Sequence, residues 1–233
     1  MRPPETHAEA PPNWRIELAL VAALWALVTL PYLGGARLWD IDEGNNTEAS
    51  REMRAADNWV VPTFNFDLRV DKPALINWLQ ILAGLAVGEG ELAARLPSAG
   101  AALITMVATW MLGRAWLGGA GGLLAACVLG TSPLFIAAAR FANPDSMLTA
   151  LVTATIASHA LGGRQGAWML PAAAFSGMAM LAKGPVGLAL PGAIIIAHLA
   201  WEGRLRSLAN RWVGLAIAIW LAVAAPWYLW VGA

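Results

Sequence analysis

Carboxylates that could do chemistry follow directly after the first apolar run of this 233-residue chain: Asp40, Asp42 and Glu43. Carboxylates just outside a membrane helix could accept a proton from an acceptor hydroxyl, or hold a divalent cation. They could equally lie at the start of a following helix, where the positive end of the helix dipole favours acids. The residues alone leave these two interpretations even.

Three other clusters combine basic and acidic side chains. Lys72 follows Asp71 at the start of a short apolar run, where it could meet a lipid phosphate as a point charge. A lysine that only snorkels from a helix end is the more common reason for such a residue. Arg140 and Asp145 belong to a polar segment between two apolar runs, and Lys183 lies between two later ones. Either of these could be an ordinary loop.

The composition indicates an integral membrane protein. Apolar residues make up 58% of the chain and charged residues 13%, whereas a soluble domain carries about 25% charged residues. The 15 basic residues equal the 15 acidic ones, so a nucleic-acid partner is not expected. The single cysteine, Cys127, excludes an internal disulfide and a cysteine-based zinc site.

Seven apolar runs are long enough to be membrane helices, since a bilayer core needs roughly 20 residues per helix. They lie near 16–33, 92–112, 117–137, 146–162, 167–182, 185–201 and 212–231. An eighth run, 73–87, is shorter, and Asp71 could cap it as a helix. The sequence therefore predicts an all-α membrane bundle.

The distribution of basic residues decides whether 73–87 spans the membrane. If it does not, seven basic residues share one side, as the positive-inside rule requires. They are Arg2, Arg15, Arg114, Arg164, Arg204, Arg206 and Arg211. We therefore predict a cytoplasmic tail over 1–15, an outer loop over 34–91 that carries the site, and six further spans within 92–233. In this topology 73–87 is an interfacial helix, and all four charged clusters face outward around a polar pocket.

Local patterns give three further expectations. Residues 45–56 read as a short helix that Asn45 and Glu48 begin with a capping-box-like pair. The small residues of 118–126 predict close helix packing. Tryptophans near span ends, including Trp110 and Trp227, are expected in the aromatic belts at the membrane surface.

Several motifs together resemble a known family. The segment WDIDEGNNTEASREMRAADNWVVPTFNFDLRVDKPALINWLQ, followed by ELAARLPSAG, ARFANPDSM and LAKGPVGLALP, is similar to the polyprenyl-phosphate-sugar glycosyltransferases. These include aminoarabinose transferases that modify lipid A, and protein mannosyltransferases. The resemblance covers about Trp14 to Trp230. It implies the GT-C fold, in which about seven transmembrane helices carry juxtamembrane helices in the first periplasmic loop.

The resemblance also implies an inverting transfer of sugar from a polyprenyl phosphate on the periplasmic face of a bacterial inner membrane. Asp42 takes the place of the catalytic aspartate with Glu43 as its motif neighbour, and Lys72 would hold the donor phosphate. Lys183 and Arg140 would add positive charge there. Asp71 and Asp145 match further acidic positions of the family's motifs and would support the site.

The donor lipid, the membrane and a lipid A-type, glycan or protein acceptor are the expected partners. No cofactor is certain, although a divalent cation could bind the acids. Asn45 and Asn46 stand where aminoarabinose transferases tend to carry arginine and tyrosine, so the sugar stays open. Residues 1–233 are expected to form one membrane module that lacks the C-terminal part of the family architecture. The alternatives are a non-catalytic module that binds polyprenyl lipid, and a transporter.

Overall fold

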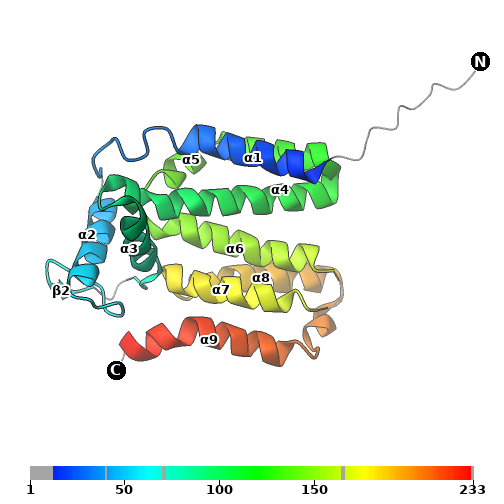
Figure 1. Ribbon diagram of the computed structural model, residues 1–233. Coiled ribbons are helices and arrows are strands. Elements are labelled where there is room, and N and C mark those ends of the chain that lie inside the picture. Colours follow the sequence, from blue (N-terminus) through cyan, green and yellow to red (C-terminus); the bar gives the residue numbers. More distant parts are fainter. Residues whose placement is uncertain (1–12, 40, 70–71, 164–165, 232–233) are drawn as a thin grey trace, which may run out of the picture.

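Apolar helices lie side by side in the computed structural model, which describes residues 13–39, 41–69, 72–163 and 166–231 (Figure 1). The helices of this bundle are α1 (Trp14–Thr29), α4 (Glu91–Gly130), α5 (Pro133–Ala139), α6 (Pro144–Leu161), α7 (Met169–Lys183), α8 (Val186–Trp201) and α9 (Val213–Val231). The bounds of α6, α7, α8 and α9 lie within two residues of the last four predicted runs. In contrast, α1 ends at Thr29, before the predicted end at 33, and the predicted run 117–137 is divided between the end of α4 and α5. By length and composition, α4 and α9 could each cross a membrane, while α7 and α8 are shorter apolar helices.

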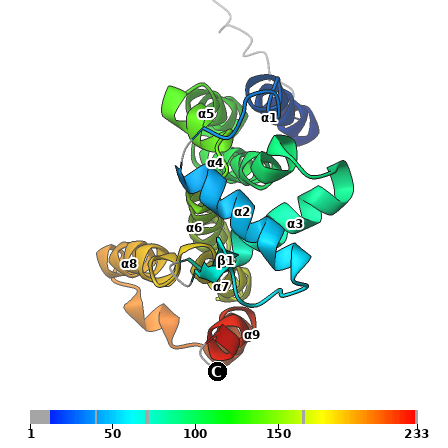
Figure 2. The same cartoon turned by 90° about the vertical axis from the view of Figure 1, so that its left-hand side faces the viewer.

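Two helices lie across one end of the bundle, α2 (Ile41–Ala55) and α3 (Leu75–Val87) (Figure 2). Between them the chain forms a two-stranded antiparallel hairpin of β1 (Thr63–Phe64) and β2 (Asp67–Leu68). A short 3₁₀ helix, η1 (Leu205–Leu208), lies at the opposite end (Figure 1). The predicted interfacial helix 73–87 is therefore present as α3. Its expected cap, Asp71, lies outside the described residues.

A break at Gly118 divides α4 into the two predicted runs. Gly118 has φ 77° and ψ −178°, a conformation that glycine adopts readily because it has no Cβ. The two halves then pack closely. A Cβ at Gly122 would lie only 2.8 Å from the carbonyl oxygen of Trp110 and 2.9 Å from the backbone nitrogen of Arg114. The small-residue face that the sequence predicts is thus the contact between these halves.

The centre of the bundle joins α4, α6 and α7 to α3. Ile76 of α3 is buried against Ala101, Met147 and Ala179, which belong to the three bundle helices. The small side chains of Ala101 and Ala179 let the helices approach one another closely. The juxtamembrane layer is therefore packed against the bundle core.

Two of the expected belt tryptophans are buried instead. Trp110 is 5% exposed, and its indole N–H donates to Glu17 at 2.9 Å, while Arg114 forms an ion pair with the same carboxylate. Trp227 is also 5% exposed and donates to the carbonyl oxygen of Val60 at 2.8 Å. Both indoles serve as hydrogen-bond donors in the interior, because a buried acceptor needs a partner.

Helix α2 begins four residues earlier than the sequence predicts. It begins at Ile41, so Asp42 and Glu43 lie in its first turn, where the helix dipole favours them. Glu43, rather than Glu48, reaches back to accept the backbone N–H of Trp39 at 3.0 Å. Asn45 therefore lies inside the helix and does not cap it.

Candidate active site

Asp42 and Lys72, thirty positions apart in the chain, form an ion pair. The ammonium nitrogen of Lys72 donates to Oδ1 of Asp42 at 2.9 Å. Asp42 comes from the first turn of α2, and Lys72 precedes α3 by three residues. The Asp42 side chain is 57% exposed, so it stays accessible to a substrate. Two of the charged clusters that the sequence predicts on one face of the membrane therefore meet.

The electrostatic surroundings of Asp42 are strongly positive. The hydrogen bond from Lys72 is the largest cause that lowers the pKa of Asp42, against a smaller opposite effect of burial. The charges of Lys72, Arg69 and Lys183 lower it further. Asp42 is therefore a carboxylate at neutral pH, and several cations act on the same point.

A second ion pair joins Lys183 to Asp145. Lys183 is the last residue of α7, and Asp145 lies in the first turn of α6. Asn143 caps that helix by accepting the backbone N–H of Asp145 at 3.0 Å. Both charged side chains of the pair are about half exposed. The two charged motifs expected on one face of the membrane are thus joined directly.

Glu43 does not share the exposure of Asp42. It is fully buried and bonds Arg95 through both carboxylate oxygens, at 2.7 Å and 2.9 Å. Burial by itself raises the pKa of Glu43, but the bonds from Arg95, Trp39 N–H and Ala142 N–H lower it overall. The family's motif neighbour of Asp42 is therefore buried in an ion pair with Arg95 while Asp42 is exposed.

Arg140 also differs from expectation. Its guanidinium donates to the carbonyl oxygen of Thr29 at 2.9 Å, and so ties the end of α1 to the segment after α5. This contact is with the backbone of α1 and not with the Asp42–Lys72 pair. Asp40 and Asp71 lie outside the described residues.

Sequence reasoning missed the residues that fix α2 against its neighbours. Arg95 is the clearest case, since its guanidinium also donates to the carbonyl oxygens of Leu33, Ala36 and Arg37. A single arginine at the start of an apolar run was a signal, because charges near membrane helices are rare and usually functional. Arg95 therefore holds both α2 and the chain that leads into it.

A buried polar network was equally hidden. Asn77 of α3 donates to Ser50 at 3.0 Å, Ser50 bonds Gln80 at 2.5 Å, and Gln80 donates to Ala94 of α4 at 3.0 Å. Arg69 donates to Asn46 of α2 at 3.0 Å. Buried polar groups need such partners, and here the partners specify how α2 lies on α3.

The hairpin leads the chain from α2 to Lys72. Asn65 and Phe66 have φ 52° and 67°, which is typical of a type I′ turn. Buried Glu52 of α2 accepts the hydroxyl of Thr63 at 2.6 Å and the backbone N–H of Phe66. One carboxylate therefore anchors the hairpin that precedes Arg69 and Lys72.

The acids do not form a metal site in the part of the chain that the structure describes. There, no group of three or more His, Cys, Asp or Glu side chains is placed to hold a metal ion. Glu43 is engaged by Arg95 and Asp42 by Lys72. The described carboxylates thus fit ion pairing better than the divalent-cation interpretation.

Comparison with known proteins agrees with this architecture. The model of the dolichyl-phosphate-mannose-protein mannosyltransferase family matches residues 71–230. An undecaprenyl phosphate-alpha-4-amino-4-deoxy-L-arabinose arabinosyl transferase of Pectobacterium atrosepticum is 31% identical over 228 residues, covering 94% of this chain and 40% of the relative. A transferase of the same name from Erwinia tasmaniensis is 30% identical, covering 89% of this chain and 39% of the relative.

Solved structures show the same fold. The crystal structure of ArnT from Cupriavidus metallidurans bound to undecaprenyl phosphate superposes with a TM-score of 0.83 at 27% identity, covering 94% of this chain and 41% of that one. Its apo form gives a TM-score of 0.81 at 28% identity over the same shares. The chain spans about 40% of the length of the relatives it matches. It is an all-α, multi-pass integral membrane protein with a GT-C-type bundle.

Proposed function

Because the chain belongs to the dolichyl-phosphate-mannose-protein mannosyltransferase family, we propose that it transfers a sugar from a polyprenyl-phosphate donor to an acceptor. The acceptor offers a hydroxyl or phosphate on a lipid A-type, glycan or protein substrate. The observation that carries this proposal is the 2.9 Å pair of Asp42 and Lys72, a base and a phosphate-binding cation at one exposed point. The arabinosyl transferases named above support a polyprenyl donor.

In the reaction, the bond between the anomeric carbon of the sugar and a phosphate oxygen breaks, and an acceptor oxygen bonds to that carbon from the opposite side. The configuration is therefore inverted. Asp42 orients the acceptor and takes its proton. Lys72 binds the departing lipid phosphate, and fixed cations stabilise the negative charge that develops there. Lys183, held by Asp145, adds positive charge, and Arg140 and Glu43 fix the helix ends around the site.

The ion pair also couples donor binding to base strength. Without donor, Lys72 bonds Asp42 and lowers its pKa, which makes Asp42 a weaker base. A bound phosphate competes for the ammonium group of Lys72, so the pKa of Asp42 rises toward its ordinary value. Asp42 thus becomes a better base when the donor is present.

The basic residues support an orientation in a bacterial inner membrane, with the N-terminus in the cytoplasm and the site on the periplasmic side. Arg15 lies in the first turn of α1, Arg206 lies in η1, and Arg204 and Arg211 lie close to η1 in the chain, at the end of the bundle away from α2 and α3 (Figure 1). Positive charge concentrates on the cytoplasmic side of membrane proteins. The Asp42–Lys72 pair then faces outward.

The test is to incubate the purified protein with a panel of polyprenyl-phosphate sugars and detect released polyprenyl phosphate by mass spectrometry. Asp42→Asn and Lys72→Ala should each lower release by about a hundredfold or more. Asp67→Asn, an exposed acid on β2, is the matched control and should keep full activity. Full activity in both site variants would refute the assignment, and donor binding without release would favour a non-catalytic lipid-binding module.

A further inference from the structure

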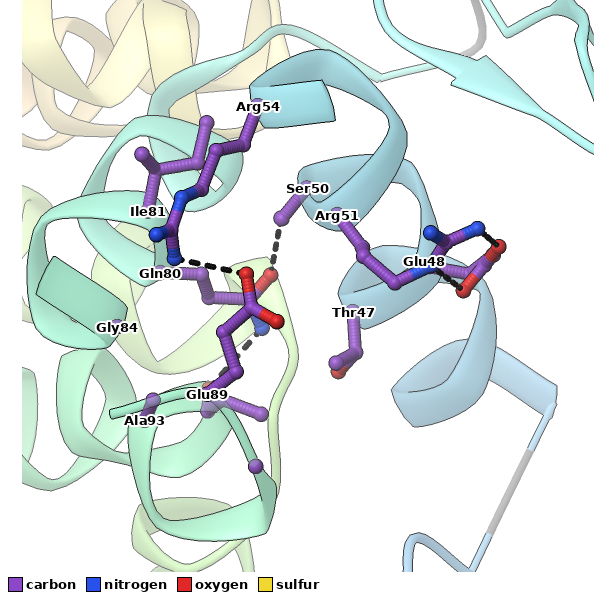
Figure 3. Close-up of a pocket in the computed structure, with 12 residues that line it drawn as sticks. Thr47, Glu48, Ser50, Arg51, Arg54, Gln80, Ile81, Gly84, Glu89 and Ala93 are labelled. Carbon is purple, nitrogen blue, oxygen red and sulfur yellow. Dashed lines mark hydrogen bonds and ion pairs between the residues drawn. The ribbon is translucent and has the colours of Figure 1, made fainter. Parts of the chain in front are cut away.

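A cavity of about 210 Å³ lies between α2, α3 and the start of α4, and neither Asp42 nor Lys72 lines it. Figure 3 shows Arg54 and Gln80 pointing toward its centre from two different helices. The reaction proposed above uses none of the side chains in this cavity. It is therefore a concave site separate from the Asp42–Lys72 pair, on the same outer layer of the molecule.

Two arginines one turn apart on α2 reach this cavity. Arg51 pairs with Glu48 at 2.6 Å, and Arg54 pairs at 2.7 Å with Glu89, which belongs to the α3–α4 connection (Figure 3). All four side chains are at least about one-third exposed. Exposed ion pairs contribute little stability, so either guanidinium can leave its carboxylate for another anion at small cost.

The geometry of the arginines favours a particular class of anion. A guanidinium presents parallel N–H groups that match two oxygens of a phosphate. Arg51 and Arg54, at positions i and i+3, lie on the same side of their helix. In the structure their guanidinium groups point to different carboxylates, Arg54 to Glu89 and Arg51 to Glu48 (Figure 3). Each guanidinium that leaves its carboxylate can offer two parallel N–H groups to a phosphate.

The floor of the cavity is apolar. Ile81 and Gly84 of α3 and Ala93 and Ala94 of α4 line it. The next residues of α3 continue this character with exposed side chains, since Leu82, Leu85 and Val87 are 54%, 61% and 50% exposed. An exposed apolar face on an interfacial helix is expected to contact lipid chains.

We propose that this cavity binds the phosphate-bearing head group of an anionic membrane lipid. Arg51 and Arg54 exchange their carboxylate partners for phosphate oxygens, and the acyl chains lie along the exposed apolar face of α3. The site is separate from the donor site at Lys72, and it does not depend on the proposed transferase activity. Glu48 and Glu89 act in it as competitors of the ligand.

Because the lipid phosphate competes with the carboxylates for the arginines, removing the arginines and removing a carboxylate should change lipid affinity in opposite directions. The detergent-purified full chain is titrated with phosphatidylglycerol, with phosphatidylcholine and with inorganic phosphate, and bound lipid is measured by native mass spectrometry. The double variant Arg51→Gln, Arg54→Gln should bind phosphatidylglycerol about tenfold more weakly or worse. Glu89→Gln should bind it more tightly, because Arg54 loses its competing partner. Arg211→Gln, on the other side of the bundle, is the control and should bind as the parent does.

The same experiment separates the sources of the phosphate and the two sites. Lys72→Ala should lose affinity for undecaprenyl phosphate and keep its affinity for phosphatidylglycerol. Thermal unfolding of each variant checks that the fold is kept. The tighter lipid binding expected in Glu89→Gln cannot arise from a loss of folding.

Four outcomes would overturn the proposal: unchanged phosphatidylglycerol binding in the double arginine variant, weaker binding in Glu89→Gln, equal binding of phosphatidylcholine, or displacement of the lipid by equimolar inorganic phosphate. Loss of phosphatidylglycerol binding in Lys72→Ala would place the lipid at the donor site, and would also contradict it.

Discussion

Replacing Arg95 by methionine should destabilise the protein more than any surface change, because Arg95 sits at the centre of a buried charge network. Its guanidinium makes five hydrogen bonds, two to Glu43 and three to the carbonyl oxygens of Leu33, Ala36 and Arg37. The side chains of Arg95 and Glu43 are 6% and 0% exposed. Removing one partner of a buried pair leaves the other charge uncompensated, which costs about 3–5 kcal/mol.

The assay is reversible unfolding of the detergent-solubilised protein by denaturant, followed by tryptophan fluorescence. Arg54→Met removes an exposed ion pair and should cost less than about 1 kcal/mol. The double variant Arg95→Met, Glu43→Met should recover part of the loss, because no buried charge remains. A cost for Arg95→Met as small as that for Arg54→Met would refute the reasoning.

The pH dependence of unfolding should change its sign in Arg95→Met. In the parent, the bonded Glu43 has a lowered pKa. Its contribution to stability is therefore present above its ordinary pKa of about 4.3 and is lost as the pH falls through the lowered value. Without Arg95, burial raises the pKa of Glu43, so the variant should gain stability as the pH falls from 7 through that raised value. A parallel loss of stability in both proteins on acidification would contradict this account.

Three other predictions concern separate parts of the molecule. Gly122→Ala places a Cβ 2.8 Å from backbone and should cost about 1–3 kcal/mol in unfolding experiments, whereas Gly100→Ala, where a Cβ meets nothing within 4 Å, should be neutral or stabilising. Lys183→Met should raise the pKa of Asp42, because it removes one of the charges that lower it. The acid limb of the pH profile of kcat/KM should then move to higher pH. Lys183→Arg keeps the charge and should leave this limb in place. Glu52→Ala removes the acceptor that anchors the hairpin, so limited proteolysis should cut within residues 63–68 faster than in the parent, and an unchanged rate would argue against that anchoring.

The apolar spans could be predicted from sequence because each leaves a local signature. A membrane helix needs an unbroken apolar run, which composition reveals, and the bounds of α6 and α9 lie within two residues of the predicted spans. Asp42 and Lys72 stood out as charges at the ends of such runs.

The start of α2 and the roles of Glu43 and Arg140 could not be predicted in this way. The capping pattern at Asn45 was as good a local signal as the true start at Ile41, and the contacts of Glu43 with Arg95 decided between them. Two adjacent acids look equivalent in the chain. In the folded protein their side chains point into different surroundings, so Asp42 is exposed while Glu43 is fully buried.

The sequence by itself determined the membrane class, the places of most long apolar helices, and the end of the bundle where charged groups gather, since these follow from hydropathy and charge along the chain. Only the tertiary structure decided which charges meet. The pairs Asp42–Lys72, Glu43–Arg95 and Asp145–Lys183 join residues 30, 52 and 38 positions apart. Such contacts depend on how the helices pack against one another, α2 and α3 across the end of the bundle and α6 beside α7 within it. This packing arises from the whole set of buried side chains at once.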